Sequence, residues 1–207
     1  MLPASVEGQL VLFSNLDILP LSSQGNYVDY WGSRVASFEV LTGHKELSLT
    51  ATSLVEVHER EHESDGMGWD ELSATAELSM EAVENLNQTR RTEPPVEVIA
   101  LAQDIAHLAL GALRSAGIPA RYVLGYLHPK LDAAIGETVT GESHAWIEWF
   151  CNGQWRGYDP TNLIDIGDRH VLVGRGRDYN DVPPLRGVYA GPFGSKLFVS
   201  VEITREA

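Results

Sequence analysis

Apolar and polar residues alternate with a period of two along the first third of the chain. Residues 34–40 and 46–57 follow this pattern, and residues 9–13 form a short apolar run before them. Alternation is typical of strands, because successive side chains of a strand point to opposite faces. The pattern predicts an antiparallel β module with one solvated face, in which residues 42–45 form a turn between two strands.

The spacing of apolar residues becomes helical in the middle of the chain. Apolar side chains recur every three or four positions from residue 69 to about 88, and again from about 96 to 116. This spacing aligns them along one face of a helix. The two prolines at 94–95 separate the helices, and the Gly-Ile-Pro sequence at 117–119 ends the second one.

Short apolar runs after this helix predict three strands at 121–127, 144–150 and 154–158, and a closing strand at 196–204. The Cys-Asn-Gly sequence at 151–153 is typical of a tight hairpin turn. A β module followed by a helix packed on an antiparallel sheet belongs to the α+β class.

These patterns divide the chain into three regions. They are an N-terminal β domain at 1–63, a helical connector at 64–95 and a core at 96–207. The 207 residues are 43% hydrophobic, which suffices to bury a core. The formal net charge of −14 argues against a nucleic-acid partner, because few cations are available to neutralise phosphates.

The composition also bears on the compartment. The chain has one cysteine, which excludes an internal disulfide and favours a reducing environment. No apolar run approaches the roughly 20 residues of a membrane-spanning helix, and the first residues lack the features of a secretory signal. We therefore expect a soluble, cytoplasmic protein without a membrane partner.

A histidine and an aspartate lie on two neighbouring predicted strands. His144 begins one strand and Asp159 follows the next, with the hairpin turn between them. Such a pair serves a cysteine nucleophile: the histidine takes the thiol proton, and the aspartate orients the ring and stabilises its charged form. We expect their side chains to face each other and to share a hydrogen bond of about 2.6–3.2 Å.

Three segments in this order resemble the transglutaminase-like superfamily: 116–126, 141–146 (Gly-Glu-Ser-His-Ala-Trp) and 158–162 (Tyr-Asp-Pro-Thr-Asn). Residues 168–187 and 29–38 resemble the bacterial branch of that superfamily, which carries an N-terminal β domain. The resemblance covers nearly the whole chain and implies a papain-like Cys-His-Asp site whose chemistry is amide hydrolysis or acyl transfer.

The resemblance also assigns positions. His144 matches the family's histidine and Asp159 its aspartate. In the family, the catalytic cysteine directly precedes the residues that match Gln103 and Asp104, at the start of a helix that supplies oxyanion donors. The nucleophile position therefore falls on Ala102. The implied substrate or ligand is a peptide or protein, and no cofactor is implied.

Alanine at the nucleophile position predicts that this chain is inactive, because alanine cannot form a thioester. A non-catalytic module that binds a peptide or protein in the remaining cleft is the alternative. Residues 94–102 resemble an earlier helix joined directly to Gln103, which suggests an internal deletion rather than a substitution. We expect Ala102 to lie within a helix.

The resemblance to the bacterial branch also implies that strands before residue 5 are absent. Apolar surfaces and strand edges that those pieces would cover are then exposed, and such surfaces favour self-association.

A second motif offers a different chemistry. His58, Glu59 and His62 fit the H-E-x-x-H pattern of a zinc hydrolase, with Glu77 or Glu81 as a third ligand. The motif requires a helix to place both histidines on one face, and this segment follows a strand and lacks an apolar stripe. We expect a solvated loop that binds no zinc tightly.

Three further features have ordinary structural interpretations. His107 lies on an apolar helix face and is expected to be a core histidine. Cys151 lies in the hairpin turn, roughly 23 Å along the strand from His144, which is too far for a substitute nucleophile. Residues 174–177, Gly-Arg-Gly-Arg, lack the ending of a phosphate-binding loop and are expected to form a turn.

Overall fold

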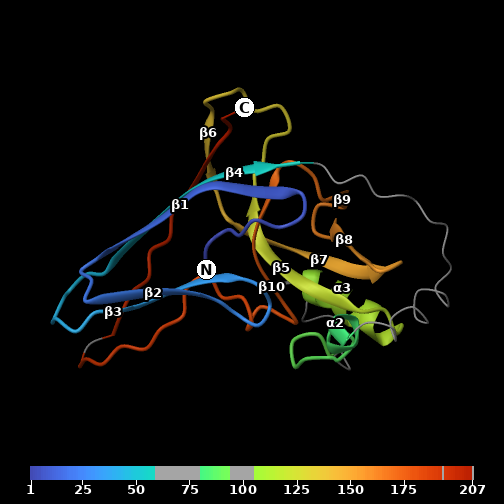
Figure 1. The fold of residues 1–207 in the computed structure, drawn as a ribbon, viewed down its shortest axis with the longest axis horizontal. Helices are drawn as coiled ribbons and strands as arrows, with labels where there is room; N and C mark the ends of the chain where they lie inside the picture. The colour runs from blue at the N-terminus through green and yellow to red at the C-terminus, as the bar shows by residue number, and fades with distance from the viewer. Residues whose placement is uncertain (59–79, 94–104, 193, 207) are drawn as a thin grey trace.

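A computed structural model describes residues 1–58, 80–93, 105–192 and 194–206 of the chain. The structure is mostly antiparallel β with few helices (Figure 1). The elements in chain order are β1 (Gln9–Leu19), β2 (Ser23–Val28), β3 (Arg34–Glu39), β4 (Ser48–Val57), α2 (Met80–Glu84), α3 (Ile105–Ser115), β5 (Ala120–Leu127), β6 (Thr138–Gly141), β7 (Ser143–Cys151), β8 (Gln154–Asp159), β9 (Ile164–Asp165), β10 (His170–Gly176) and β11 (Val201–Thr204).

The predicted N-terminal β module is present as two antiparallel pairs, β1 with β4 and β2 with β3. The segment at 42–45 connects β3 to β4, which belong to different pairs, so it does not close a hairpin. β2 was not predicted. All six of its residues are exposed, so the strand has no buried face that an alternating sequence pattern could reveal.

The predicted core sheet has five strands in the order β10-β5-β7-β8-β9, and every neighbouring pair is antiparallel. The predicted hairpin joins β7 to β8. Asn152 and Gly153 have φ values of 52° and 75°, as the favoured two-residue hairpin turn requires. The predicted closing strand is shorter than expected: β11 covers Val201–Thr204 and pairs with β6 outside this sheet.

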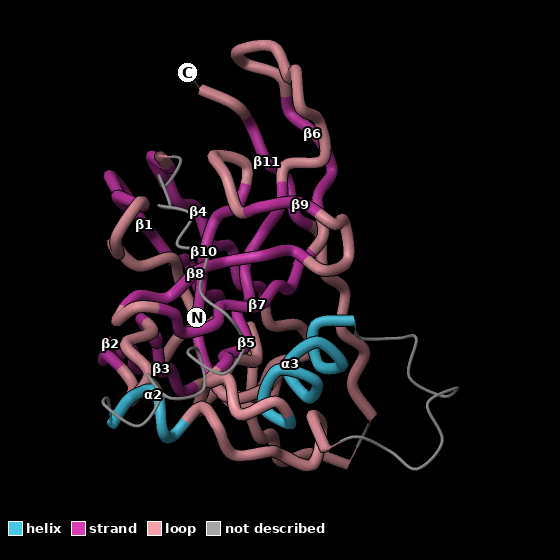
Figure 2. Tube along the Cα trace, turned by 90° about the vertical axis from the view of Figure 1, so that its right-hand side faces the viewer, coloured by secondary structure: helices cyan, strands magenta, loops and turns pink. Residues whose placement is uncertain are grey.

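α3 covers one face of the five-stranded sheet, as Figures 1 and 2 show. Ala106 and Leu110 of the helix pack with Tyr122, Leu124 and Ile147 of β5 and β7 in the main core. The helix ends as predicted. Gly117 follows it with a φ of 78°, which is the left-handed conformation that glycine adopts at such ends. Residues 96–104 of the predicted helix lie outside the described part of the chain.

The opposite face of the sheet carries a second, smaller core. It consists of Val123, Trp146 and Leu172, with Ile166 packed against them. The alternation of β7 places His144 and Glu148 on this same face, because Ala145 and Ile147 point into the main core.

The N-terminal module contacts the sheet at its edge strand, β10. The buried side-chain amide of Gln9 accepts a hydrogen bond from the Leu172 N–H at 2.7 Å and donates to the Leu172 carbonyl at 2.9 Å. The side chain thus imitates a neighbouring strand. Among the described residues, no helix is long and apolar enough to span a bilayer.

Candidate functional site

The predicted histidine–aspartate pair is present at one end of the sheet. His144 lies near the start of β7 and Asp159 ends β8, and the two strands are antiparallel neighbours. His144 Nε2 lies 2.6 Å from Asp159 Oδ2. The geometry is the one expected from the sequence, and it leaves the other ring nitrogen, Nδ1, for a different partner.

Asp159 is fully buried and its carboxylate is saturated with donors. Oδ1 accepts the backbone N–H groups of Thr161 and Asn162 at 3.0 and 3.1 Å. Oδ2 accepts the side-chain amide of Asn162 at 2.7 Å in addition to His144. Burial acts to raise the pKa of Asp159, but the hydrogen bonds from His144, His170 and Asn162 outweigh it and hold the pKa well below its usual range.

The proton positions in the pair follow from this ionisation. A carboxylate can only accept hydrogen bonds, so His144 donates through Nε2–H to Asp159. In a neutral imidazole the lone pair then lies on Nδ1. No hydrogen bond joins this nitrogen to any residue in the described segments. Nδ1 of His144 is therefore the atom that would take a proton or accept a hydrogen bond from a ligand.

A second histidine, which the sequence did not predict as a site residue, completes the cluster. His170 begins β10, and its Nε2 lies 3.5 Å from Asp159 Oδ2. Its side chain is 1% exposed. β10 was not predicted as a strand, so nothing in the sequence pattern placed this residue beside the pair.

Trp146 and Gly125 are close neighbours of His144. The Trp146 ring is buried and meets the His170 ring edge to face, with centroids 5.3 Å apart. Gly125 lies opposite His144 in the strand register. A Cβ there would lie 2.1 Å from the Val171 carbonyl oxygen and 2.5 Å from Trp146 Cη2, so only glycine fits between these neighbours.

Ala102, Gln103 and Asp104 lie outside the described residues. The only cysteine, Cys151, is the last residue of β7, at the opposite end of the strand from His144, and it is buried and free. Cys151 therefore lies far from His144, as predicted.

His107 is the predicted core histidine. It is 3% exposed and stacks on Tyr122 with ring centroids 4.7 Å apart. Its Nε2 accepts the backbone N–H of Tyr179 at 3.2 Å. A satisfied and buried ring of this kind has a packing role.

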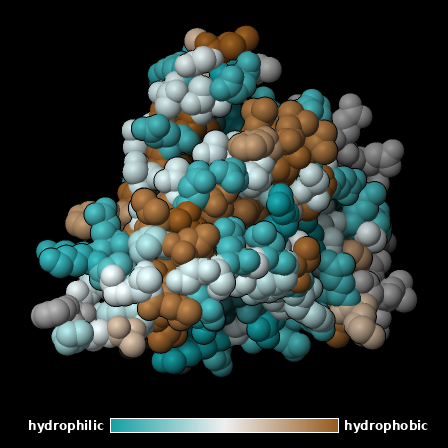
Figure 3. Space-filling view, turned by 60° about the vertical axis from the view of Figure 1, so that its left-hand side comes forward, coloured by the Kyte–Doolittle hydropathy of each residue, from teal (hydrophilic) through white to brown (hydrophobic). Residues whose placement is uncertain are grey.

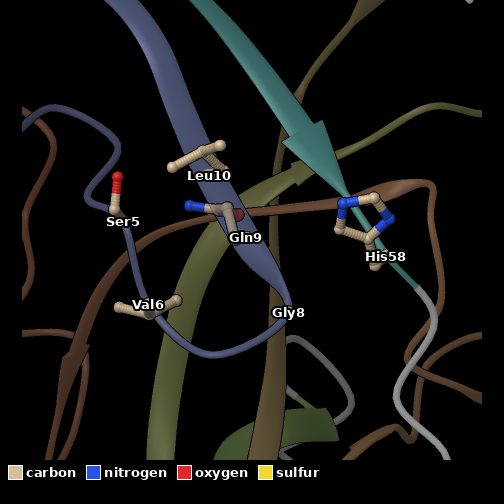
Figure 4. Close-up of a pocket in the computed structure, with 6 residues that line it drawn as sticks. All are labelled: Ser5, Val6, Gly8, Gln9, Leu10 and His58. Atoms are coloured by element: carbon tan, nitrogen blue, oxygen red, sulfur yellow. The ribbon is translucent and has the colours of Figure 1, made fainter.

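The H-E-x-x-H segment is described only in part. His58 follows β4, its side chain is 65% exposed, and its Nε2 lies 3.3 Å from Glu56 Oε1. It borders a shallow hollow together with Gly8, Gln9 and other N-terminal residues (Figure 4). Glu59, His62 and Glu77 lie outside the described residues.

Glu81 and residues 174–177 have structural partners. Glu81 pairs with Arg121 at 2.6 Å. The turn predicted for residues 174–177 was wrong, because Gly174 to Gly176 continue β10 and Arg175 bonds to Glu148. Ser33, Asp181 and Val182 pack closely against the strand at Gly174 and Gly176, which leaves little room for a side chain at these two positions.

Comparison with known families gives two matches along the chain. Residues 68–160 match the transglutaminase-like superfamily, and residues 1–56 match the bacterial transglutaminase-like N-terminal region. The first range contains His144 and Asp159.

Three similar proteins illustrate these matches. An uncharacterised protein of Mycobacterium leprae is 36% identical over 252 residues, which cover 99% of this chain and 90% of the relative. An uncharacterised protein of Mycobacterium tuberculosis is 43% identical over 113 residues, which cover 50% of this chain and 35% of the relative. The crystal structure of a proposed cysteine protease from Cytophaga hutchinsonii has a TM-score of 0.54 at 19% identity, covering 87% of this chain and 75% of that one. This last likeness concerns the fold.

The alignment with the M. leprae protein is longer than this chain. It spans more positions than the 207 residues of this chain, although nearly all of the chain takes part. The M. leprae protein therefore has residues inside the aligned region that have no counterpart here.

Proposed function

The chain belongs to the transglutaminase-like superfamily, and from this premise we propose that it is a non-catalytic member that binds a peptide or protein segment. The chemistry of such a site needs a thiol, a base and a group that orients the base. Our proposal is that this chain keeps the base and its orienting group without the thiol. The proposal rests on the position of its only cysteine.

The base half of the site is complete in its hydrogen bonding. Asp159 fixes His144 in the tautomer that presents a lone pair at Nδ1, through the 2.6 Å bond at Nε2. In a thiol enzyme this lone pair would take the proton of the nucleophile. In the proposed function it accepts a hydrogen bond from an N–H group of the ligand.

The thiol half has no candidate. The single sulfhydryl of the chain belongs to Cys151, which is 4% exposed. It lies seven residues from His144 on the same strand, roughly 23 Å along an extended chain. The nucleophile position taken from the family, Ala102, carries only a methyl group. Covalent acyl transfer through a thioester then has no starting point.

The nature of the ligand follows from access and charge. The His144 side chain is 17% exposed, and Asn162 beside it is exposed, so a ligand can reach the ring. A formal net charge of −14 disfavours acidic ligands. A neutral or basic peptide that presents a backbone N–H to His144 Nδ1 fits both conditions.

Incubation with casein and with a fluorogenic peptide amide tests the absence of catalysis. We expect no product above the buffer rate, and no covalent acyl adduct on the native protein by intact-mass measurement. Iodoacetamide should label Cys151 only after unfolding. Hydrolysis that is lost in both a His144→Ala and a Cys151→Ser variant would overturn this part of the proposal.

Titration of the isotope-labelled protein with an unstructured peptide rich in lysine and glutamine tests the binding. We expect the His144 ring signals to shift in a saturable way. A matched peptide in which glutamate replaces lysine should bind more weakly. The absence of any shift with the basic peptide at millimolar concentration would contradict the proposed binding role.

A further inference from the structure

The contact between His170 and Asp159 brings a third strand to the candidate site. His170 belongs to β10, whereas the other two members of the cluster belong to β7 and β8. Its Nε2 lies 3.5 Å from Asp159 Oδ2, and its side chain is almost fully buried. A buried imidazole with no other partner at Nε2 among the described residues has this carboxylate as its natural acceptor.

The tautomer of His170 follows from its other nitrogen. The backbone N–H of Gly167 donates to Nδ1 at 3.2 Å, in a turn that is also closed by the His170 N–H bonding to the Gly167 carbonyl at 3.1 Å. Nδ1 is therefore an acceptor and carries no proton. In the neutral ring the proton is on Nε2, directed at Asp159.

We propose that His170 is a positioning residue for the site: a neutral imidazole whose Nε2–H helps to hold the Asp159 carboxylate so that Oδ2 also faces His144. The backbone donors of Thr161 and Asn162 hold Oδ1. Side chains of Asn162, His144 and His170 converge on Oδ2. The inference rests on the proposed function only in taking the His144–Asp159 pair as the working part of the molecule.

Two histidines and an aspartate could also be taken for a metal site. The potential ligand atoms of His144, Asp159 and His170 lie within 4.8 Å of one another. A histidine that binds a metal through Nε2 normally donates its Nδ1–H to an acceptor. At His170 the neighbour of Nδ1 is a donor, the Gly167 N–H. The arrangement therefore suits a hydrogen-bonded cluster better than a metal centre.

The position of His170 depends in turn on the N-terminal module. Gln9 of β1 bonds both backbone groups of Leu172, two residues after His170. The same amide donates to the Ala4 carbonyl at 2.9 Å. β10 is thus fixed on one side by β5 and on the other by a buried side chain from outside the sheet.

Long-range ¹H–¹⁵N NMR on the full-length protein tests the tautomer directly. At neutral pH we expect His170 to carry its proton on Nε2 and none on Nδ1. A proton on Nδ1 overturns the proposal. So does stoichiometric uptake of Zn²⁺ by the wild-type protein that disappears in a His170→Leu variant.

Two substitutions separate positioning from packing. His170→Gln keeps an N–H donor at similar reach, and His170→Leu removes it. Titration of the Asp159 carboxyl by ¹³C NMR should show a raised pKa in His170→Leu and a pKa close to wild type in His170→Gln. If the two variants titrate alike, His170 only fills space and the proposal fails.

If His170→Leu does not fold, the tautomer in the wild-type protein still decides the question. The peptidase and peptide-binding assays report on the proposed function separately. Either of them can fail while the tautomer result stands.

Discussion

Glu148 carries a buried charge on the same face of the sheet as the candidate site. It is 2% exposed, and Arg121 of β5 and Arg175 of β10 form ion pairs with its carboxylate. Arg121 Nε lies 2.7 Å from Oε2, and Arg175 bonds both carboxylate oxygens at 2.9 and 3.1 Å. Burial acts to raise the pKa of Glu148, but Arg175 and Arg121 outweigh it and lower the pKa to about 2.

The direction of this shift sets the pH dependence of stability. The folded-state pKa lies below the usual value of 4.5, so the folded protein gains stability when Glu148 is ionised. That stabilisation is complete above about pH 4.5 and is lost as the pH falls towards about 2. Glu148→Gln should lower the free energy of unfolding by about 3 kcal/mol at pH 7, because two arginines lose their buried partner.

Urea unfolding of wild type and Glu148→Gln between pH 7 and pH 3 measures this effect. The difference between the two proteins should shrink as the pH falls. Glu137→Gln is a suitable control, since Glu137 pairs with Lys130 at the surface, where solvent screens the attraction and such pairs contribute little to stability. A Glu148→Gln effect no larger than that of the control would contradict this account.

At the scale of elements, the sequence predicted the core strands that are marked by apolar runs or by the hairpin turn, and missed those without such a signal. β5, β7 and β8 were found, and with them the facing of His144 and Asp159. β10 was missed because glycines at 174 and 176 interrupt its apolar run, and its contacts come from distant segments. His170 was missed for the same reason. A tertiary neighbour such as Gln9 has no signature in local sequence.

Gln9 provides a test of how firmly the N-terminal module holds β10. Gln9→Met keeps the size of the side chain but leaves the N–H and carbonyl of Leu172 without their partner. We expect a loss of about 2 kcal/mol of stability or more, because buried backbone groups would go unsatisfied. Hydrogen exchange at the Leu172 amide should become faster.

The control for this substitution is Gln24→Met, on the exposed strand β2. It should leave exchange at Leu172 and global stability unchanged. Equal protection of the Leu172 amide in wild type and Gln9→Met would show that the side chain does not hold β10.

At the scale of the whole molecule, apolar side chains remain on the surface of the N-terminal module. Leu12, Phe13 and Leu19 of β1 are 56%, 54% and 73% exposed. Figure 3 shows apolar side chains gathered in patches on one face of the molecule. Within the described residues, β1–β4 and β2–β3 are two-stranded sheets with open edges.

We therefore expect the chain to self-associate through its N-terminal module, against the repulsion of a net charge of −14. Salt screens that repulsion, so sedimentation velocity should show more dimer or larger species at high ionic strength and high protein concentration. Phe13→Lys should reduce association by placing a charge on β1. Leu131→Lys is the control: Leu131 lies in a loop and is 78% exposed, and its replacement should not reduce association. A strictly monomeric protein at all salt and protein concentrations, with an unfolding temperature independent of concentration, would show that the exposed strands do not form an interface.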